Sequence, residues 1–119
     1  MLVDDDVSVR EVLRDYIQLY CPQFIITAEA GDGEEAVLLA ERHKPDVILM
    51  DVRMPVLDGI EATRRIKQEL GLASSVITFT SYAYPELESE AKKVGALHHL
   101  RKPFTLDELQ NVLTSVVKV

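Results

Sequence analysis

Four consecutive apolar residues, Val47 to Met50, lead directly into Asp51, and prolines at positions 45 and 55 flank this run. A continuous apolar run of this length is typical of a strand that is buried on both faces, as in parallel sheets covered by helices. In open α/β sheets, ligands bind beyond the carboxyl ends of the strands. Asp51 therefore stands where a binding site is expected, although a loop carboxylate that ends a strand or caps a helix explains it equally well.

Two kinds of hydrophobic spacing divide the chain. Short runs of apolar and β-branched residues predict strands at 1–3, 24–28, 47–51, 76–80 and 96–100. Apolar residues at i, i+3 and i+4 predict helices at 8–20, 34–43, 60–70, 85–94 and 106–117. The first and last helices are expected to turn inward Val9, Val12, Leu13, Tyr16, Ile17 and Tyr20, and Leu106, Leu109, Leu113, Val116 and Val117.

Strand and helix alternate five times in this pattern. Such alternation predicts right-handed βαβ units, and therefore an α/β fold: a doubly wound, five-stranded parallel sheet with five helices on its two faces. Ser8 or Asp6 is expected to begin the first helix, Thr105 the last, and Asp58 to shape the loop before Gly59. The order of the strands does not follow from the pattern.

The chain is acidic and contains one cysteine. Its 119 residues suffice for one domain, and its formal net charge of -7 argues against unaided binding to nucleic acid, because an acidic surface repels phosphate. Cys21 has no partner for an internal disulfide, which suits a reducing compartment. Because we find no signal peptide and no run of membrane-spanning length, we expect a cytoplasmic protein without a membrane contact.

Polar side chains follow four of the predicted strands. The first strand leads to Asp4 and Asp5, the third to Asp51, the fourth to Thr80 and Ser81, and the fifth to Lys102. Parallel strands would bring these groups to one edge of the sheet. Neighbouring carboxylates repel one another unless a cation intervenes, and Mg²⁺ prefers oxygen ligands. Carboxylates, Mg²⁺, a lysine and a hydroxyl together suit a phosphoryl group, with a carboxylate as nucleophile.

These residues carry a resemblance to a known family. Val3-Asp4-Asp5-Asp6, Leu49 to Gly59, Thr80-Ser81 and Lys102-Pro103-Phe104 resemble, in order, the acidic pair, phosphoacceptor, hydroxyl and lysine motifs of response-regulator receiver domains of two-component systems. The resemblance covers residues 1–119 and implies a flavodoxin-like fold with the effector domain absent or removed. It also implies a phosphoprotein in which Asp51 accepts phosphate from a sensor histidine kinase or a phosphotransfer protein.

The resemblance assigns a role to each site residue. Mg²⁺ would be bound directly by Asp5, Asp51 and the backbone carbonyl of Arg53, and through water by Asp4. Lys102 and Thr80 would contact the phosphoryl oxygens, and the Lys102–Pro103 bond would be cis. Other readings stay open: a solvated helix start for Asp4 and, preferably, for Asp6, a surface lysine for Lys102, and an ordinary strand end for Thr80.

Two further assignments concern switching and phosphate lifetime. By resemblance Thr80 couples to an aromatic residue on the fifth strand, a position held here by His99, which could also be a half-exposed histidine with no role. Its neighbour His98 should point to the opposite face. The bulky Arg53 and Tyr82 occupy positions that tune phosphate lifetime, unless they are simply solvent-facing side chains.

The main hypothesis is a phosphorylation switch rather than an enzyme. Phosphorylation would change the face formed by the fourth helix, fifth strand and fifth helix, which would bind a partner or form a homodimer. The output could be transcriptional, with nucleic acid contacted only through an effector domain outside this chain. A haloacid-dehalogenase-like phosphatase would need a second acid where Arg53 stands, and a receiver that only mediates contacts would not need the full set of site residues.

Overall fold

A single parallel sheet organises the computed structural model, which describes residues 1–81 and 84–116. Its strands lie in the order β2-β1-β3-β4-β5, all parallel. Their bounds are Leu2–Val3 for β1, Glu29–Ala30 for β2, Val47–Asp51 for β3, Ser75–Thr80 for β4 and His98–Arg101 for β5. The predicted doubly wound α/β fold is therefore confirmed.

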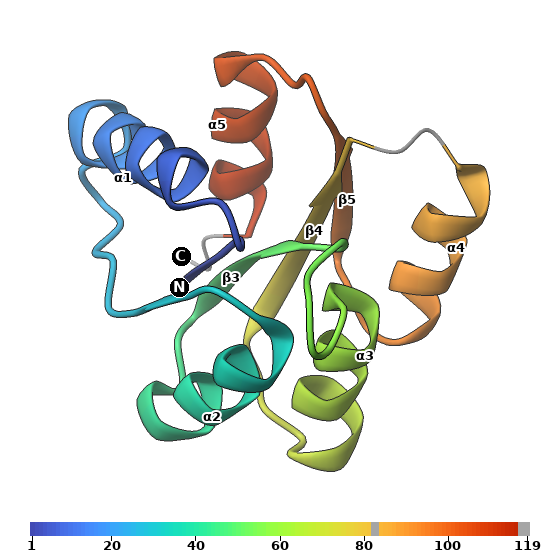
Figure 1. Cartoon of the computed structure of the whole chain (residues 1–119). Coiled ribbons are helices and arrows are strands. Elements are labelled where there is room, and N and C mark those ends of the chain that lie inside the picture. Colours follow the sequence, from blue (N-terminus) through green and yellow to red (C-terminus); the bar gives the residue numbers. More distant parts are fainter. Residues whose placement is uncertain (82–83, 117–119) are drawn as a thin grey trace.

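The helices cover both faces of this sheet. Their bounds are Val7–Tyr20 for α1, Gly33–His43 for α2, Gly59–Arg64 for α3, Pro85–Lys93 for α4 and Leu106–Ser115 for α5, and a π-helical segment, Arg65–Glu69, continues α3. Helices α1 and α5 lie together on one face, while α2, α3 and α4 lie on the other (Figure 1). None of the helices in these described ranges has the length and apolar character needed to cross a bilayer.

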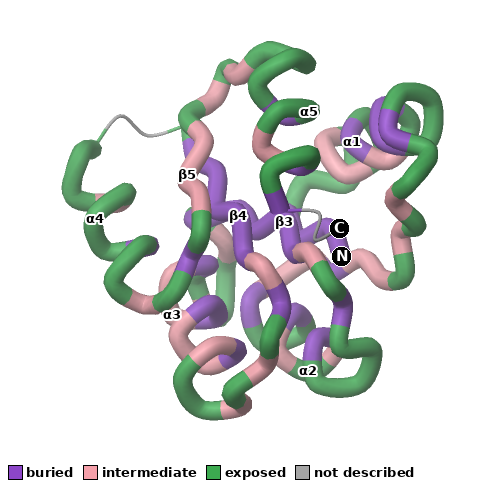
Figure 2. Tube along the Cα trace, turned by 180° about the vertical axis from the view of Figure 1, so that it is seen from behind, coloured by how far each residue is buried: buried purple, intermediate pink, exposed green. Residues whose placement is uncertain are grey.

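Strand β3 is buried from both sides, as its continuous apolar run predicts. Ile48 and Met50 pack toward α2 and α3, whereas Leu49 packs toward α1 and α5. The buried trace at the centre of Figure 2 follows β3 and β4. Because side chains alternate along the strand, β3 contributes residues to two separate apolar cores.

The second strand lies later in the chain than its composition predicts. Residues 24–28 are irregular, and β2 is Glu29–Ala30. The prediction was wrong because β-propensity describes side chains, whereas a strand needs a paired neighbour, and β1 supplies only Leu2 and Val3 for this edge. Phe24 and Ile26 still pack against the core, and Ile25 is 84% exposed.

The inward faces of α1 and α5 are narrower than predicted. Leu13, Tyr16, Ile17, Leu109, Leu113 and Val116 are buried. Val12, Tyr20 and Leu106 are more than half exposed, because a helix on a sheet covers only one narrow stripe. Val117 lies outside the described residues.

Polar caps fix where the helices start. Asp6, not Ser8, caps α1 and accepts a hydrogen bond from the Ser8 N–H at 2.9 Å. Thr105 caps α5, as the sequence predicts, and Asp58, which was expected to shape the loop before Gly59, caps α3. Each helix therefore begins directly after the loop that leaves a strand's carboxyl end.

The strand order decides where a site can form. The chain passes from β1 outward to β2 and then crosses back to β3 on the other side of β1. The connections after β1 and β3 therefore leave the sheet in opposite directions and open a crevice between their carboxyl ends. Asp4 and Asp51 stand at this point.

Candidate functional site

Three carboxylates meet at the ends of β1 and β3. Asp4 and Asp5 follow β1, and Asp51 is the last residue of β3. Each offers an oxygen within 4.8 Å of those of the other two. Asp4 is 2% exposed and Asp51 6%, whereas Asp5 is exposed to solvent. The cluster thus has a buried floor and an open side, and the structure brings together the acidic residues that the sequence predicts.

The environment of Asp51 favours its protonated form. Burial is the main cause, the negative charge of Asp4 adds to it, and Asp5 adds a smaller repulsion, so that the pKa of Asp51 is raised to about 7. The positive charge of Lys102 and a hydrogen bond from the Arg53 N–H, 3.4 Å from Asp51 Oδ1, act in the opposite direction. A bound cation would offset the repulsion among the three carboxylates.

Lys102 lies over the acidic cluster on its β5 side. Its Nζ is 3.4 Å from Asp4 Oδ2 and 4.8 Å from the centre of the Phe79 ring. Its backbone N–H donates to the Thr80 carbonyl at 2.7 Å, and the peptide bond that joins it to Pro103 is cis. The family resemblance implies this cis bond.

Thr80 ends β4, the strand beside β3, and its side chain is fully buried. In the register of these strands Asp51 pairs with Phe79, so Thr80 stands one residue beyond the level of Asp51. Arg53 is exposed in the loop after β3, and Tyr82 lies outside the described residues. Asp4, Asp5, Asp51, Thr80 and Lys102 therefore share one edge of the sheet.

Gly59 lets α3 begin directly against the end of β3. Its N–H donates to the Val52 carbonyl at 2.8 Å, and a Cβ added at this position would overlap the Asp51 carbonyl oxygen. Only a residue without a side chain permits this approach. The glycine therefore sets the distance between α3 and the backbone that carries Asp51.

The loop between β3 and α3 contains a feature that sequence reasoning missed. Val56 has a φ of 69°, and the Leu57 N–H donates to the Pro55 carbonyl at 2.7 Å, which forms a γ-turn centred on Val56. A β-branched residue with positive φ is strained. No sequence signal could have found it, because glycine or asparagine is the residue expected at such a position.

His99 contacts a threonine two residues before Thr80. Its Nδ1 lies 2.7 Å from Oγ1 of Thr78, which is its cross-strand neighbour on β4. His98 points to the opposite face, as predicted, and its Nε2 lies 3.0 Å from Ser115 Oγ on α5. Thr78 was missed, although its position two residues before Thr80 puts it on the same face.

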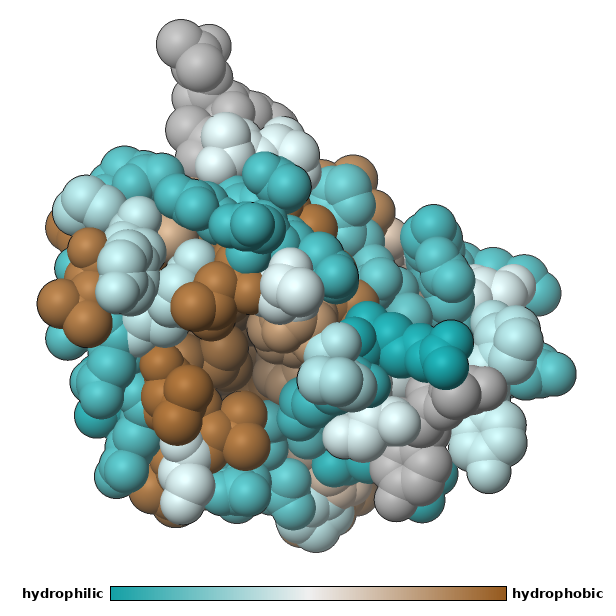
Figure 3. All heavy atoms as spheres, turned by 90° about the horizontal axis from the view of Figure 1, so that it is seen from above, coloured by the Kyte–Doolittle hydropathy of each residue, from teal (hydrophilic) through white to brown (hydrophobic). Residues whose placement is uncertain are grey.

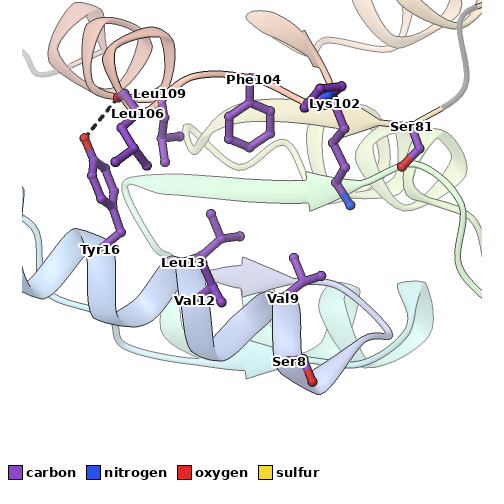
Figure 4. A pocket seen from close by; sticks show the side chains of 11 residues that line it. Ser8, Val9, Val12, Leu13, Tyr16, Ser81, Lys102, Phe104, Leu106 and Leu109 are labelled. Carbon is purple, nitrogen blue, oxygen red and sulfur yellow. Dashed lines mark hydrogen bonds between the residues drawn. The ribbon is translucent and has the colours of Figure 1, made fainter.

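An apolar groove runs between α1 and α5 and ends beside Lys102. Its volume is about 640 Å³, and its lining includes Val9, Val12, Leu13, Phe104, Leu106 and Leu109. Lys102, Ser8 and Ser81 stand at one end, and the hydrogen bond from Tyr16 to the Leu106 carbonyl closes the other (Figure 4). Seen from above, apolar side chains gather around a hollow on this side of the molecule (Figure 3).

This combination of fold and site defines a receiver domain, and sequence comparison agrees. The sequence model of the response regulator receiver domain matches residues 1–114. The chain therefore belongs to the receiver domain family of response regulators. That assignment and the arginine at position 53 both argue against the phosphatase hypothesis.

Curated relatives share the domain but differ in length. The chain is 38% identical over 119 residues to the chemotaxis protein CheY of Halobacterium salinarum, and the match covers 97% of this chain and 96% of that protein. It is 36% identical over 109 residues to the transcriptional regulatory protein PdtaR of Mycobacterium tuberculosis, with 92% and 51% covered. It is 57% identical over 114 residues to protein-glutamate methylesterase/protein-glutamine glutaminase 1 of Cupriavidus pinatubonensis, with 96% and 33% covered. The chain thus spans about half of PdtaR and a third of the methylesterase.

Solved structures show the same fold. A two-component response regulator of the LuxR family from Aurantimonas sp. SI85-9A1 superimposes with a TM-score of 0.90 at 35% identity, covering 98% of this chain and 81% of that chain. The CheX–CheY–BeF3–Mg complex from Borrelia burgdorferi gives a TM-score of 0.87 at 29% identity, with 98% and 87% covered.

Proposed function

We propose that Asp51 accepts a phosphoryl group from a phosphohistidine of a sensor histidine kinase or a phosphotransfer protein, with Mg²⁺ bound at the acidic cluster. The observation that carries this proposal is the convergence of Asp4, Asp5 and Asp51 within 4.8 Å, with the Lys102 ammonium beside them. A cluster of this kind provides negative charge for a metal ion and a cation for phosphoryl oxygens.

The donor atoms of the cluster fit Mg²⁺. In the proposal, Asp5, Asp51 and the backbone carbonyl of Arg53 bind the ion, and Asp4 binds it through water. The open side formed by the exposed Asp5 suits an ion that keeps several of its waters. When bound, Mg²⁺ would neutralise the carboxylates and the incoming phosphoryl oxygens.

In the chemical step a carboxylate oxygen of Asp51 attacks the phosphorus atom. A new O–P bond forms as the P–N bond to the donor imidazole breaks, and the donor nitrogen then takes up a proton from solvent. Only ionised Asp51 is a nucleophile, so the pKa of about 7 makes the metal-free site half-protonated near neutral pH. Lys102 balances the charge that accumulates on the phosphoryl oxygens.

The partner is proposed to lay a helix along the groove between α1 and α5. The groove has an apolar lining, as an amphipathic helix requires, and it ends beside Lys102. A helix in this groove would bring its own side chains to the edge of the sheet that carries Asp51.

The output of the switch is proposed to depend on Thr80 and His99. Contact of Thr80 with a phosphoryl group would shift the end of β4, and the cross-strand contact between Thr78 and His99 joins β4 to β5. The change would reach the face formed by α4, β5 and α5, where a partner binds or a homodimer forms. Arg53, and Tyr82 outside the described residues, are proposed to slow attack by water.

The domain is proposed to catalyse only its own phosphorylation and dephosphorylation, so any further activity belongs to a linked domain. Two outputs are supported by the names of relatives: transcriptional regulation, as for PdtaR, and protein-glutamate methylesterase activity, favoured by the 57% identity. The complete coding sequence would distinguish them, because the two outputs require different domains linked to the receiver domain.

Mass spectrometry tests the phosphoacceptor directly. We expect incubation with phosphoramidate and Mg²⁺ to add one acid-labile phosphoryl group to the wild type and none to Asp51→Asn. The variant Asp58→Asn is the matched control, because it changes an exposed carboxylate that caps α3 outside the cluster. An adduct that persists in Asp51→Asn, or a folded wild type that never forms one, would contradict the proposal.

A further inference from the structure

Arg10 of α1 reaches back to the loop that carries the acidic pair. Its Nη1 donates to the backbone carbonyl oxygen of Asp4 at 2.6 Å, and its Nε donates to Glu29 Oε1 at 3.3 Å. The Arg10 side chain is only 17% exposed. One guanidinium therefore links α1, the end of β1 and β2.

Glu29 is held in turn by a second arginine. Arg14 donates from Nε to Glu29 Oε2 at 2.7 Å and from Nη2 to Oε1 at 2.9 Å. Hydrogen bonds from Arg14 are the main reason that the pKa of Glu29 is lowered. Glu29 is thus ionised and pairs with both arginines, whereas Arg10, unlike Arg14, also donates to the Asp4 carbonyl.

Asp4 is bonded at every polar group that it has. Its N–H donates to the Ala30 carbonyl at 3.1 Å, its Oδ1 accepts from the Asp6 N–H at 2.9 Å, and its Oδ2 accepts from Lys102 at 3.4 Å. The bond from Arg10 to its carbonyl oxygen completes the set. This carbonyl belongs to the same planar peptide unit as the N–H of Asp5, so Arg10 also sets the backbone direction from which Asp5 starts.

We infer that Arg10 is a positioning residue for the proposed Mg²⁺ site: it fixes the Asp4–Asp5 peptide so that the Asp5 carboxylate faces Asp4 and Asp51. Asp5 is exposed, so its backbone, rather than packing around its side chain, fixes its position. The inference rests on the proposed function and adds a residue that binds neither metal nor phosphate.

Charge and geometry predict opposite effects of removing Arg10 on the affinity for Mg²⁺. As a cation near an acidic cluster, Arg10 repels Mg²⁺, so its removal would strengthen metal binding if charge alone mattered. As a positioning residue it holds a ligand in place, so its removal weakens metal binding, typically by about 10-fold or more for partners of this kind.

The test is a calorimetric Mg²⁺ titration of the wild type, Arg10→Gln and Arg14→Gln at one pH and ionic strength. Arg14→Gln is the matched control, because it removes the same charge and a Glu29 contact without touching Asp4. We expect Arg10→Gln to bind Mg²⁺ about 10-fold more weakly, and Arg14→Gln to bind it as tightly as the wild type or slightly more tightly. At saturating Mg²⁺, phosphorylation of Arg10→Gln by phosphoramidate should recover, because its effect lies in metal affinity.

Equal Mg²⁺ affinities in the two glutamine variants would overturn the inference. If urea denaturation shows that Arg10→Gln is unfolded, Arg10→Lys provides the test instead, because it keeps the charge. Weaker Mg²⁺ binding by Arg10→Lys supports the inference, and Mg²⁺ binding equal to that of the wild type overturns it. A wild type that binds no Mg²⁺ at all would instead refute the proposed metal site, and the inference with it.

Discussion

Asp51 illustrates at the scale of one residue how position changes the chemistry of a carboxyl group. The same side chain on a solvated loop would ionise near pH 4. At the end of β3 it is buried beside Asp4, and its pKa is raised to about 7. Its ionised form therefore destabilises the metal-free fold, and it is useful only when a cation or a phosphoryl donor binds.

Replacing Asp51 by asparagine should stabilise the metal-free protein in a pH-dependent way. The pKa of Asp51 in the folded state lies above its unfolded value, so its favourable contribution is complete below about pH 4 and is lost as pH rises through about 7. We expect Asp51→Asn to gain about 1–3 kcal/mol at pH 8, after allowance for solvent on the open side, and little at pH 4.5. Urea denaturation in EDTA at several pH values measures the difference, and a gain that does not change with pH would contradict this account.

Val56 is a second residue in an unfavourable position, because its backbone conformation does not suit a β-branched side chain. It is 75% exposed, so its side chain contributes little packing, while its φ of 69° is strained for a β-branched residue. We expect Val56→Asn to raise the free energy of unfolding by about 1 kcal/mol, because asparagine tolerates this conformation. Val7→Asn, at an exposed valine in the first turn of α1, is the control and should show no such gain. Chemical denaturation at pH 7 provides both values.

Among the secondary-structure elements, the helix caps, the strand ends and the pairing of β4 with β5 position the residues of the site. Asp6, Asp58 and Thr105 cap the helices that follow β1, β3 and β5, and so end the loops of the site. The sequence predicted the cap at Thr105, because a cap residue acts on its own neighbours in the chain. Thr78 was missed, because its contact with His99 depends on the register of two strands.

Removing the Thr78 hydroxyl should weaken the contact between β4 and β5. We expect Thr78→Val to lower the free energy of unfolding by about 1 kcal/mol, the usual worth of a buried hydrogen bond. The His99 ring should also lose this contact, which a change in its nitrogen chemical shifts would report. Ser115→Ala removes the comparable partner of His98 on the opposite face and should leave the His99 signals unchanged.

At the scale of the whole molecule, stability and signalling are linked through the same cluster. Carboxylates from β1 and β3 repel one another across the crevice between these strands, and a bound cation would join them. Metal binding should therefore stabilise the entire domain, because the ligands come together only in the folded chain.

Thermal denaturation with and without Mg²⁺ checks this linkage. At a Mg²⁺ concentration ten times its dissociation constant, we expect a gain of about 1.4 kcal/mol in the wild type and a smaller gain in Asp51→Asn. Ca²⁺ and K⁺ at equal ionic strength serve as controls for specificity and for screening. A stabilisation that is equal in wild type and variant would show that Mg²⁺ acts outside the cluster.

Local patterns in the sequence predict the fold class, the order of the elements and the residues that gather at the candidate site. Periodic apolar positions specify strands and helices locally, and the polar residues Asp4, Asp51, Thr80 and Lys102 follow directly where strands end. Tertiary structure decided the strand order, the position of β2, the partner of His99, the strain at Val56 and the bond from Arg10 to Asp4. These features depend on which segments become neighbours in space, and no local pattern of side chains encodes that.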